Sequence, residues 1–177
     1  MKFIYIAILS VILIGCASSK NNVSAAQIAN LKKAVENNQL EIISDAANPV
    51  AFTNTRGLES LLPPGSNLAR ISLINNPNFF KIKNDSIDLY LPYYGEQQIG
   101  GAYNSESGLK FNGKPARTKI EFDSSKNRYN LTYVLNANNE SLTANLTLFA
   151  NNTSTLRINS SIRTTIIYYG KWAKLEE

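Results

Sequence analysis

Short segments in which apolar and polar residues alternate fill the second half of the chain, from residue 119 to residue 175. Residues 129–135 and 142–148 are the clearest of them, and Asn- or Ser-containing turns separate each segment from the next. A period of two is typical of strands that bury one face. Because we expect no helix in this region to cover that face, the strands must close into a barrel or pack against another sheet. The sequence therefore predicts a mainly β fold, either an antiparallel barrel or a strongly curved sheet.

The apolar members of these segments are the predicted interior of that barrel. Ile120 and Phe122 belong to the same apolar face, because they alternate with charged residues at 119, 121 and 123. The residues that we expect to line the interior are Leu131, Tyr133, Leu142, Leu146, Leu148 and Leu156. An eight-stranded barrel can be filled by such side chains or can hold one small ligand, so the pattern leaves both possibilities open.

The first half of the chain predicts one helix and several strands. Ser24 and Gln27 have the spacing of a capping box, and apolar residues at helical spacing follow, so we expect a helix over Ala25–Asn37 that packs against one edge or end of the sheet. The predicted strands are 40–47, 69–74, 79–83, 86–91 and 109–111, with Asn112–Pro115 as a turn after the last of them.

The N-terminal segment predicts export and lipid anchoring. Lys2 precedes an apolar run from Phe3 to Ile14, which is shorter than the ~20 residues that a membrane-spanning helix needs. Leu13-Ile14-Gly15-Cys16 matches the bacterial lipobox. We therefore expect residues 1–15 to be a signal peptide, Cys16 to carry the lipid, residues 16–23 to be a tether and residues 24–177 to be one domain. Ala17 is not the Asp that marks inner-membrane retention, which favours the outer membrane, facing the periplasm rather than the cell surface.

The composition excludes several classes of chemistry. The chain contains no His and one Cys, so a Ser-His-Asp or Cys-His nucleophile system and an ordinary zinc site are both excluded, as is an intramolecular disulfide. We expect no cofactor and no enzymatic activity. The net charge of +5 is spread along the chain without a basic block, so we expect no nucleic-acid partner.

The stretch Leu91-Pro92-Tyr93-Tyr94-Gly95 is the most conspicuous candidate for a site. Tyr93, Tyr94 and Gln98, together with Tyr103 in the glycine-bearing loop Ile99–Gly108, are the candidate contacts to a ligand or partner. A structural role is the alternative: Pro92 ends a strand, Gly95 supplies a positive φ, and the tyrosines close one end of the barrel. Of the two, the structural role is the favoured interpretation of this corner.

The same corner carries a family resemblance. With Gly108-Leu109-Lys110-Phe111, Asn48-Pro49 and the closing set Arg163, Ile166, Tyr168, Tyr169 and Gly170, it resembles the Bacteroidetes lipoproteins catalogued as domain of unknown function 4251. The resemblance covers roughly residues 25–175. It implies a lipocalin-like antiparallel barrel and implies no activity.

Two versions of a non-enzymatic function follow from these observations. In the first, the barrel interior binds a small apolar ligand. In the second, the barrel is filled and its outer face acts as a scaffold or docks an envelope protein. The membrane is a partner in both, through the lipid at Cys16.

Overall fold

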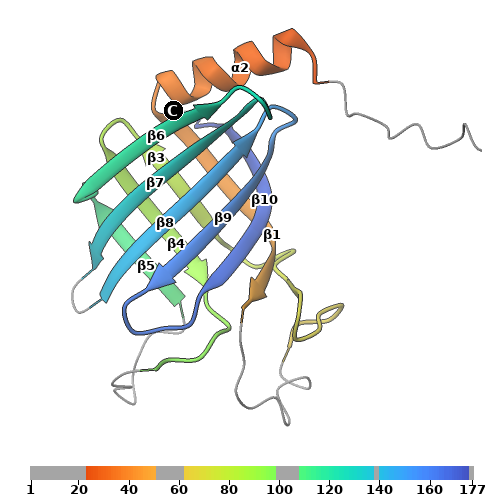
Figure 1. Cartoon of the computed structure of the whole chain (residues 1–177). Helices are drawn as coiled ribbons and strands as arrows, with labels where there is room; N and C mark the ends of the chain where they lie inside the picture. Colours follow the sequence, from red (N-terminus) through yellow and green to blue (C-terminus); the bar gives the residue numbers. More distant parts are fainter. Residues whose placement is uncertain (1–22, 51–61, 99–107, 138–139, 176–177) are drawn as a thin grey trace, which may run out of the picture.

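The computed structural model describes residues 23–50, 62–98, 108–137 and 140–175. Within these ranges one helix, α2 (Ala25–Glu36), precedes a single antiparallel sheet (Figure 1). The mainly β fold with one short N-terminal helix is therefore confirmed. The strands are β1 (Gln39–Pro49), β2 (Ile71–Ser72), β3 (Phe79–Lys83), β4 (Ser86–Pro92), β5 (Gly108–Gly113), β6 (Arg117–Asp123), β7 (Arg128–Ala137), β8 (Glu140–Phe149), β9 (Thr153–Ser160) and β10 (Ile166–Lys174).

The sheet is curled but open between β5 and β6. Its strand order is β5-β4-β3-β1-β10-β9-β8-β7-β6, and β2 pairs with β1 beside this path. Figure 1 shows β6–β9 passing in front of β3–β5, so that the two halves of the curled sheet face each other across the core. Of the two architectures that the sequence allowed, the strongly curved sheet, a half-barrel, is the one observed.

The prediction of a turn at Asn112–Pro115 was wrong in its position. Asn112 and Gly113 belong to β5, where they pair with Asp88 and Ile87 of β4. The pairing with β4 holds both residues in the strand, so the chain turns only after Gly113. The two strands that this turn joins, β5 and β6, then diverge to opposite edges of the sheet.

Helix α2 lies across one end of the half-barrel (Figure 1). The predicted capping box is present, because Gln27 N donates to Ser24 Oγ at 3.2 Å and Ser24 N donates to Gln27 Oε1 at 2.8 Å. Asn38, with φ of 50°, takes the left-handed conformation that ends the helix. Leu31, Ala34 and Val35 are buried in the same core as the sheet, which confirms the expected packing of the helix on the end of the sheet.

The interior is filled by side chains of the chain itself. The six residues expected to line it are 0–3% exposed and belong to one continuous apolar cluster: Leu131, Tyr133, Leu142, Leu146, Leu148 and Leu156. Phe80, Leu89 and Tyr168 enter this cluster from the other half of the sheet and are also buried.

Strand β6 departs from the predicted burial. Ile120 and Phe122 are 42% and 46% exposed, although their cross-strand partners Leu131 and Tyr129 are buried. The expectation that both would be buried was wrong because β6 is an edge strand, and β5, which could have covered it, lies at the other edge.

The expected strand 69–74 is much shorter in the structure, where β2 spans only Ile71 and Ser72. The Asn67 side chain explains the difference. Its Oδ1 accepts hydrogen bonds from the backbone of Ala69 and Arg70 at 3.0 and 2.9 Å, and these bonds form a local turn in place of extended pairing.

Strand β1 contains an irregularity at Asp45, opposite Gly170 of β10. The Asn78 side chain forms hydrogen bonds with the backbone next to this irregularity. Ser44 N donates to Asn78 Oδ1 at 2.8 Å, and Asn78 Nδ2 donates to Ser44 O at 3.0 Å. A Cβ on Gly170 would lie 2.0 Å from Ile43 O, so glycine at 170 permits the close approach of the two strands.

No helix within the described ranges has the length and apolar character that crossing a bilayer would take.

Candidate functional site

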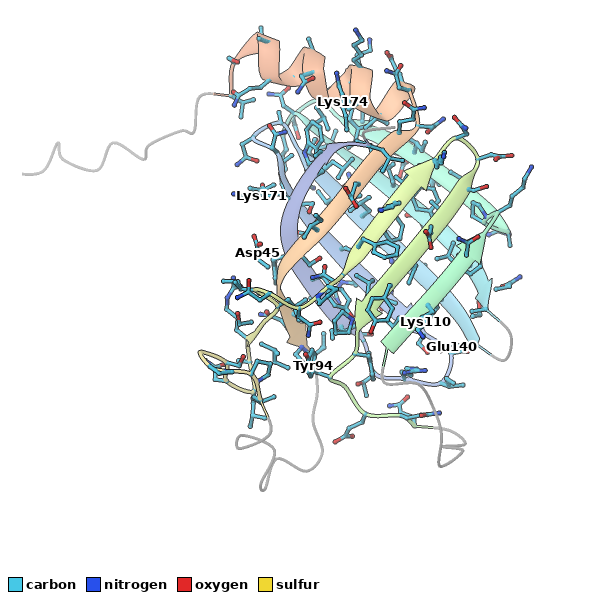
Figure 2. All side chains as sticks on the ribbon, turned by 180° about the vertical axis from the view of Figure 1, so that it is seen from behind. Asp45, Tyr94, Lys110, Glu140, Lys171 and Lys174 are labelled. Atoms are coloured by element: carbon cyan, nitrogen blue, oxygen red, sulfur yellow. The ribbon has the colours of Figure 1, made fainter. Side chains whose placement is uncertain are left out.

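The tyrosine corner, residues 93–98, crosses the end of the half-barrel opposite α2. Figure 2 places Tyr94 at that end, and Lys174, the last residue of β10, close to the helix. After β4 ends at Pro92, the corner pairs with the connection between β9 and β10: Thr164 N donates to Glu96 O at 2.9 Å and Gln98 N donates to Ile162 O at 2.8 Å. These backbone bonds tie the corner to a segment about 70 residues away in sequence.

The Tyr93 hydroxyl is central to this attachment. It lies 2.9 Å from both Thr164 O and Thr164 Oγ1 and 3.0 Å from Glu96 O. Thr164 Oγ1 also accepts a hydrogen bond from Glu96 N at 3.0 Å. Burial raises the pKa of Tyr93 above its ordinary value, in spite of the opposing effect of the hydrogen bond with Thr164. The phenol is therefore a neutral group that holds two loops together.

Gly95 is required for space and not for a positive φ, which corrects the interpretation from sequence. The described residues with positive φ do not include it. A Cβ on Gly95 would instead lie 2.3 Å from Tyr93 Oη and 2.6 Å from Thr164 Oγ1. Both atoms take part in the hydrogen bonds that attach the corner to the β9–β10 connection. Glycine at 95 therefore leaves the space in which these hydrogen bonds form.

Of the predicted contact residues, the structure describes Tyr93, Tyr94 and Gln98. The Tyr94 hydroxyl accepts a hydrogen bond from Asn76 Nδ2 at 3.0 Å, so its polar atom, like that of Tyr93, already has a partner within the chain. Gln98 is exposed, and the bond that ties it to the protein comes from its backbone. Tyr103 and Cys16 lie outside the described residues.

A charged network beneath the corner was not predicted from the sequence. Arg163 and Glu140 form an ion pair at 3.2 Å, and both side chains are 12% exposed. The Arg163 guanidinium lies 5.2 Å from the centre of the Tyr93 ring, and Ser160 Oγ donates to the Glu140 carboxylate. Ser160 Oγ in turn accepts from the backbone N–H groups of Ile162 and Arg163, at 3.0 Å each. The network thus fixes the loop to which the corner is attached.

Sequence spacing contains little signal for this network. Glu140 falls in a predicted turn, and Arg163 stands out only as part of the family pattern. The two residues are 23 positions apart and come together because β8 and β9 pair.

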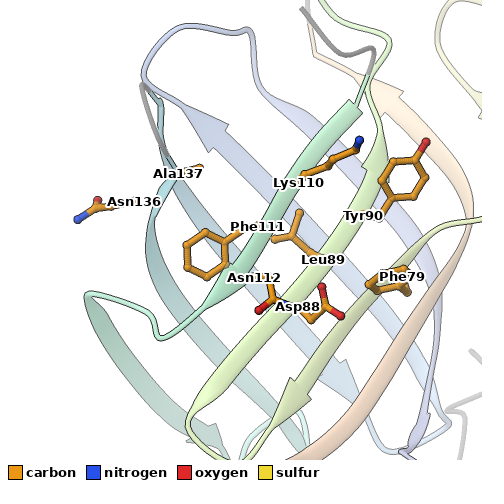
Figure 3. A pocket seen from close by; sticks show the side chains of 9 residues that line it. All are labelled: Phe79, Asp88, Leu89, Tyr90, Lys110, Phe111, Asn112, Asn136 and Ala137. Atoms are coloured by element: carbon orange, nitrogen blue, oxygen red, sulfur yellow. The ribbon is translucent and has the colours of Figure 1, made fainter.

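Two hollows lined by described residues lie along the opening of the sheet. The larger, of about 720 Å³, runs over β3–β5 to the end of β7, and Figure 3 shows its lining side chains. We call it the seam hollow; it is lined by Phe79, Asp88, Leu89, Tyr90, Lys110, Phe111, Asn112, Asn136 and Ala137. The smaller, of about 570 Å³, lies between the turn that follows α2, the β3–β4 turn and the inner face of β6; its lining includes Ile82, Ile87, Pro115, Thr118, Ile120 and Tyr133.

The side chains around these hollows offer apolar contact and a few charges. Lys110 Nζ lies 5.6 Å from the centre of the Tyr90 ring on the wall of the seam hollow. At the smaller hollow, Lys114 forms an ion pair with Asp85, which lowers the pKa of the carboxyl. In the part of the chain that the structure describes, no group of three or more His, Cys, Asp or Glu residues could hold a metal ion.

Comparison with known proteins agrees with this architecture. The family model described as Domain of unknown function (DUF4251) matches residues 22–172. The chain belongs to this family. The resemblance predicted from the corner and the closing strand is thereby confirmed. No match to this DUF4251 chain was found among curated proteins.

One solved DUF4251 protein is similar in structure. It is a DUF4251 family protein from Bacteroides eggerthii DSM 20697, with a TM-score of 0.56 and 16% sequence identity. The alignment covers 85% of this chain and 89% of that one. At this level of identity the likeness concerns the fold, and it supports the curled antiparallel sheet with its N-terminal helix.

Proposed function

We propose that this DUF4251 protein is a non-enzymatic, lipid-anchored envelope protein whose filled half-barrel binds through its outer surface. The observation that carries the proposal is the continuous interior cluster. The residues that would line a ligand cavity in a lipocalin-like barrel are 0–3% exposed and pack against each other. The hollows described above, in contrast, lie along the opening of the sheet.

The chemistry of the chain supports a binding role. The whole chain lacks His, which removes the commonest general base. Glu140 and Arg163, whose side chains are each 12% exposed beneath the corner, neutralise each other and fix a loop. Tyr93 is also committed to hydrogen bonds within the protein.

Substitution of a small interior residue tests whether the interior is filled. Ala144 is fully buried on the inner face of β8, between Tyr133 and Ile158. In a filled core, Ala144→Leu should destabilise the protein by about 1–3 kcal/mol, because overpacking displaces its neighbours. A hollow barrel would accept the larger side chain. Urea unfolding measures the difference, and Thr143→Leu, on the outer face of the same strand, is the matched control. An Ala144→Leu variant as stable as this control would contradict a filled interior.

The anchor is tested separately. The lipobox at Leu13–Cys16 supports acylation of Cys16, and acylation by more than one chain gives stable membrane attachment. We expect Cys16→Ser to move the protein to the soluble fraction, and globomycin to block processing of the wild type. A Cys16→Ser protein that stays in the membrane would refute the anchor. The outer membrane, facing the periplasm, remains the proposed location, because Ala17 is not the retention signal Asp.

If Cys16 carries the lipid, the position of α2 sets the point at which the domain is attached. The tether then joins the domain at the start of α2, which lies at the end of the half-barrel opposite the corner (Figure 1 and Figure 2).

A second candidate function is binding of a small apolar ligand in the seam hollow. Its volume of about 720 Å³ is favourable, since it falls within the range of ordinary ligand sites, and Phe79, Leu89 and Phe111 line it. We would then expect saturable binding of N-phenyl-1-naphthylamine that Phe111→Asp abolishes and Phe122→Asp, on β6 outside this hollow, preserves. Equal binding by both variants would exclude this site.

A further inference from the structure

Strand β6 is an open edge with apolar residues on its inner face. In the described part of the sheet it pairs only with β7, so the backbone groups on its other side have no neighbouring strand. All residues from Arg117 to Phe122 are exposed. Natural edge strands are usually protected by charged side chains, by Pro, by a bulge or by an inward-pointing charge, and the charges of β6 all lie on its outer face. The inner face of β6 carries Thr118, Ile120 and Phe122 instead.

The outer face of β6 has a charge pattern that is complementary to itself. Its four charged residues read positive, positive, negative, negative: Arg117, Lys119, Glu121 and Asp123. In an antiparallel pair of two β6 strands with Ile120 opposite Ile120, Lys119 of each copy faces Glu121 of the other. Arg117 likewise faces Asp123, but the Asp123 carboxylate already accepts hydrogen bonds from Arg128 Nε at 3.0 Å and from Ser125 Oγ at 2.6 Å within its own chain. The Lys119–Glu121 pairs are therefore the main electrostatic contribution in this register. Every charged position then lies opposite a charge of the other sign, which stabilises a cross-strand pair.

Neighbouring registers centred on a charged residue keep only part of this complementarity, because each of them places two like charges opposite each other at its centre. A shift that centres the pair on Glu121 places two Glu121 carboxylates opposite each other, and a shift that centres it on Lys119 does the same with two ammonium groups. Registers centred between two residues place Ile120 opposite a charged residue. A parallel pair in register places like charges opposite each other along the whole strand. The sequence of β6 therefore favours one antiparallel register over the alternatives.

The inner face fits the same register. Thr118 of one copy lies opposite Phe122 of the other, and Thr118 and Ile120 line the hollow of about 570 Å³ described above. The second copy's Phe122 would therefore lie beside an open space whose walls include Ile82, Ile87 and Tyr133. In the single chain Phe122 contacts only the ring of Tyr129 among aromatic neighbours within the described residues, at 4.9 Å between centroids, and is 46% exposed.

We propose that the protein forms a two-fold symmetric dimer in which the β6 edges of two copies pair antiparallel about Ile120. The curled sheet becomes continuous across the two subunits. Lys119 and Glu121, which form an ion pair at 2.8 Å within one strand, exchange this contact for pairs between the strands. The inference rests on the proposal that the outer surface is the binding surface, and it names a second copy of this chain as the partner.

The other edge of the sheet does not offer the same surface. β5 spans six residues between Gly108 and Gly113, and its inner-face residue Leu109 is 1% exposed. Lys110 and Asn112, on its outer face, line the seam hollow and do not provide charges of both signs. Of the two edges, β6 is therefore the one whose sequence favours pairing with the same strand of a second copy.

Charge reversal tests the register. The full chain with Cys16→Ser, which removes the proposed lipid site, is used throughout, and its mass is followed by analytical ultracentrifugation. We expect the parent to sediment as a dimer. Lys119→Glu and Glu121→Lys should each raise the dimer dissociation constant by at least about tenfold, because two-fold symmetry turns two attractive pairs into repulsive ones. Lys32→Glu, on the exposed face of α2, is the control and should leave the dimer intact.

Mixing the two charge-reversal variants gives the decisive result. An equimolar mixture of the Lys119→Glu and Glu121→Lys proteins should form a heterodimer, because 119 and 121 again carry opposite charges across the pair. The double variant Lys119→Glu/Glu121→Lys should form a homodimer for the same reason. A monomeric parent, dimeric single variants or a mixture that stays monomeric would each overturn the proposal. None of these outcomes affects the test of the filled interior by Ala144→Leu, so failure of the dimer and failure of the proposed function are distinguishable.

Discussion

Gly95→Ala is the substitution that tests most sharply whether the tyrosine corner is a structural attachment. The added Cβ would lie 2.3 Å from Tyr93 Oη, 2.6 Å from Tyr93 Cζ and 2.6 Å from Thr164 Oγ1. Real Cβ atoms do not approach other atoms so closely, so the Tyr93 ring or the β9–β10 connection has to move. Either movement breaks the hydrogen bonds of the Tyr93 hydroxyl to Thr164 and Glu96.

The expected cost has two parts. Loss of the hydroxyl's hydrogen bonding costs about 1 kcal/mol, and crowding of a packed site costs about 1–3 kcal/mol. We therefore expect the free energy of unfolding to fall by about 2–4 kcal/mol. For a domain of this size that corresponds to a decrease in Tm of roughly 4–16 °C, measurable by urea unfolding and by thermal denaturation followed by circular dichroism.

A double-mutant cycle with Tyr93→Phe separates the two parts. Tyr93→Phe alone should cost about 1 kcal/mol, since it removes the hydroxyl and keeps the ring. In the double variant the atom that the new Cβ would meet at 2.3 Å is absent, so the double variant should cost less than the sum of the single variants. A Gly95→Ala protein as stable as the wild type, or strictly additive costs, would refute the attachment and reopen the corner as a binding site.

Three further substitutions or conditions test other parts of the structure. Gly170→Ala places a Cβ 2.0 Å from Ile43 O, where backbone must move, so we expect a loss above about 3 kcal/mol or no soluble protein, and wild-type stability in urea would contradict the close approach of β1 and β10. Arg163→Met leaves the Glu140 carboxylate, only 12% exposed, without its ion-pair partner, so urea unfolding should show a loss of about 2–4 kcal/mol, and a neutral result would show that the network does not fix the loop. Burial holds the pKa of Tyr168 well above its ordinary value of 10.0, so the folded protein keeps the phenol proton of this residue. The stability that comes from this difference in proton affinity between the folded and unfolded states is complete below pH 10 and is lost as the pH rises further. Ultraviolet difference spectroscopy should therefore detect Tyr168 ionisation only together with unfolding, and ionisation near pH 10 in the folded protein would contradict its burial.

The alternation of apolar and polar residues predicted most of the sheet, because strand period and burial on one face are local properties of the sequence. Residues 142–148 show this directly: Leu142, Ala144, Leu146 and Leu148 are all buried, as their spacing indicates. The same reasoning failed for Ile120 and Phe122. Their alternation is as regular, but burial of β6 depends on whether a neighbouring strand or sheet covers it, which the spacing of residues does not reveal.

The candidate site was only partly predictable for a similar reason. Pro92, Tyr93 and Gly95 marked the position of the corner, and the sequence favoured a structural role for it. Thr164, the residue that receives the corner, has no local feature that distinguishes it from other Thr residues in the chain. The reason for Gly95 was also misjudged, because a requirement for space depends on atoms that come from Thr164, 69 positions further along the chain.

Native mass spectrometry of the protein released from its own membranes tests the central claim most directly. The claim is that side chains fill the half-barrel and that binding takes place on its outer surface. The account predicts a lipidated chain, as a dimer, without a small molecule retained in stoichiometric amount. A stoichiometric apolar ligand that the Ala144→Leu substitution displaces would contradict the claim, because it would show that the interior is a ligand site.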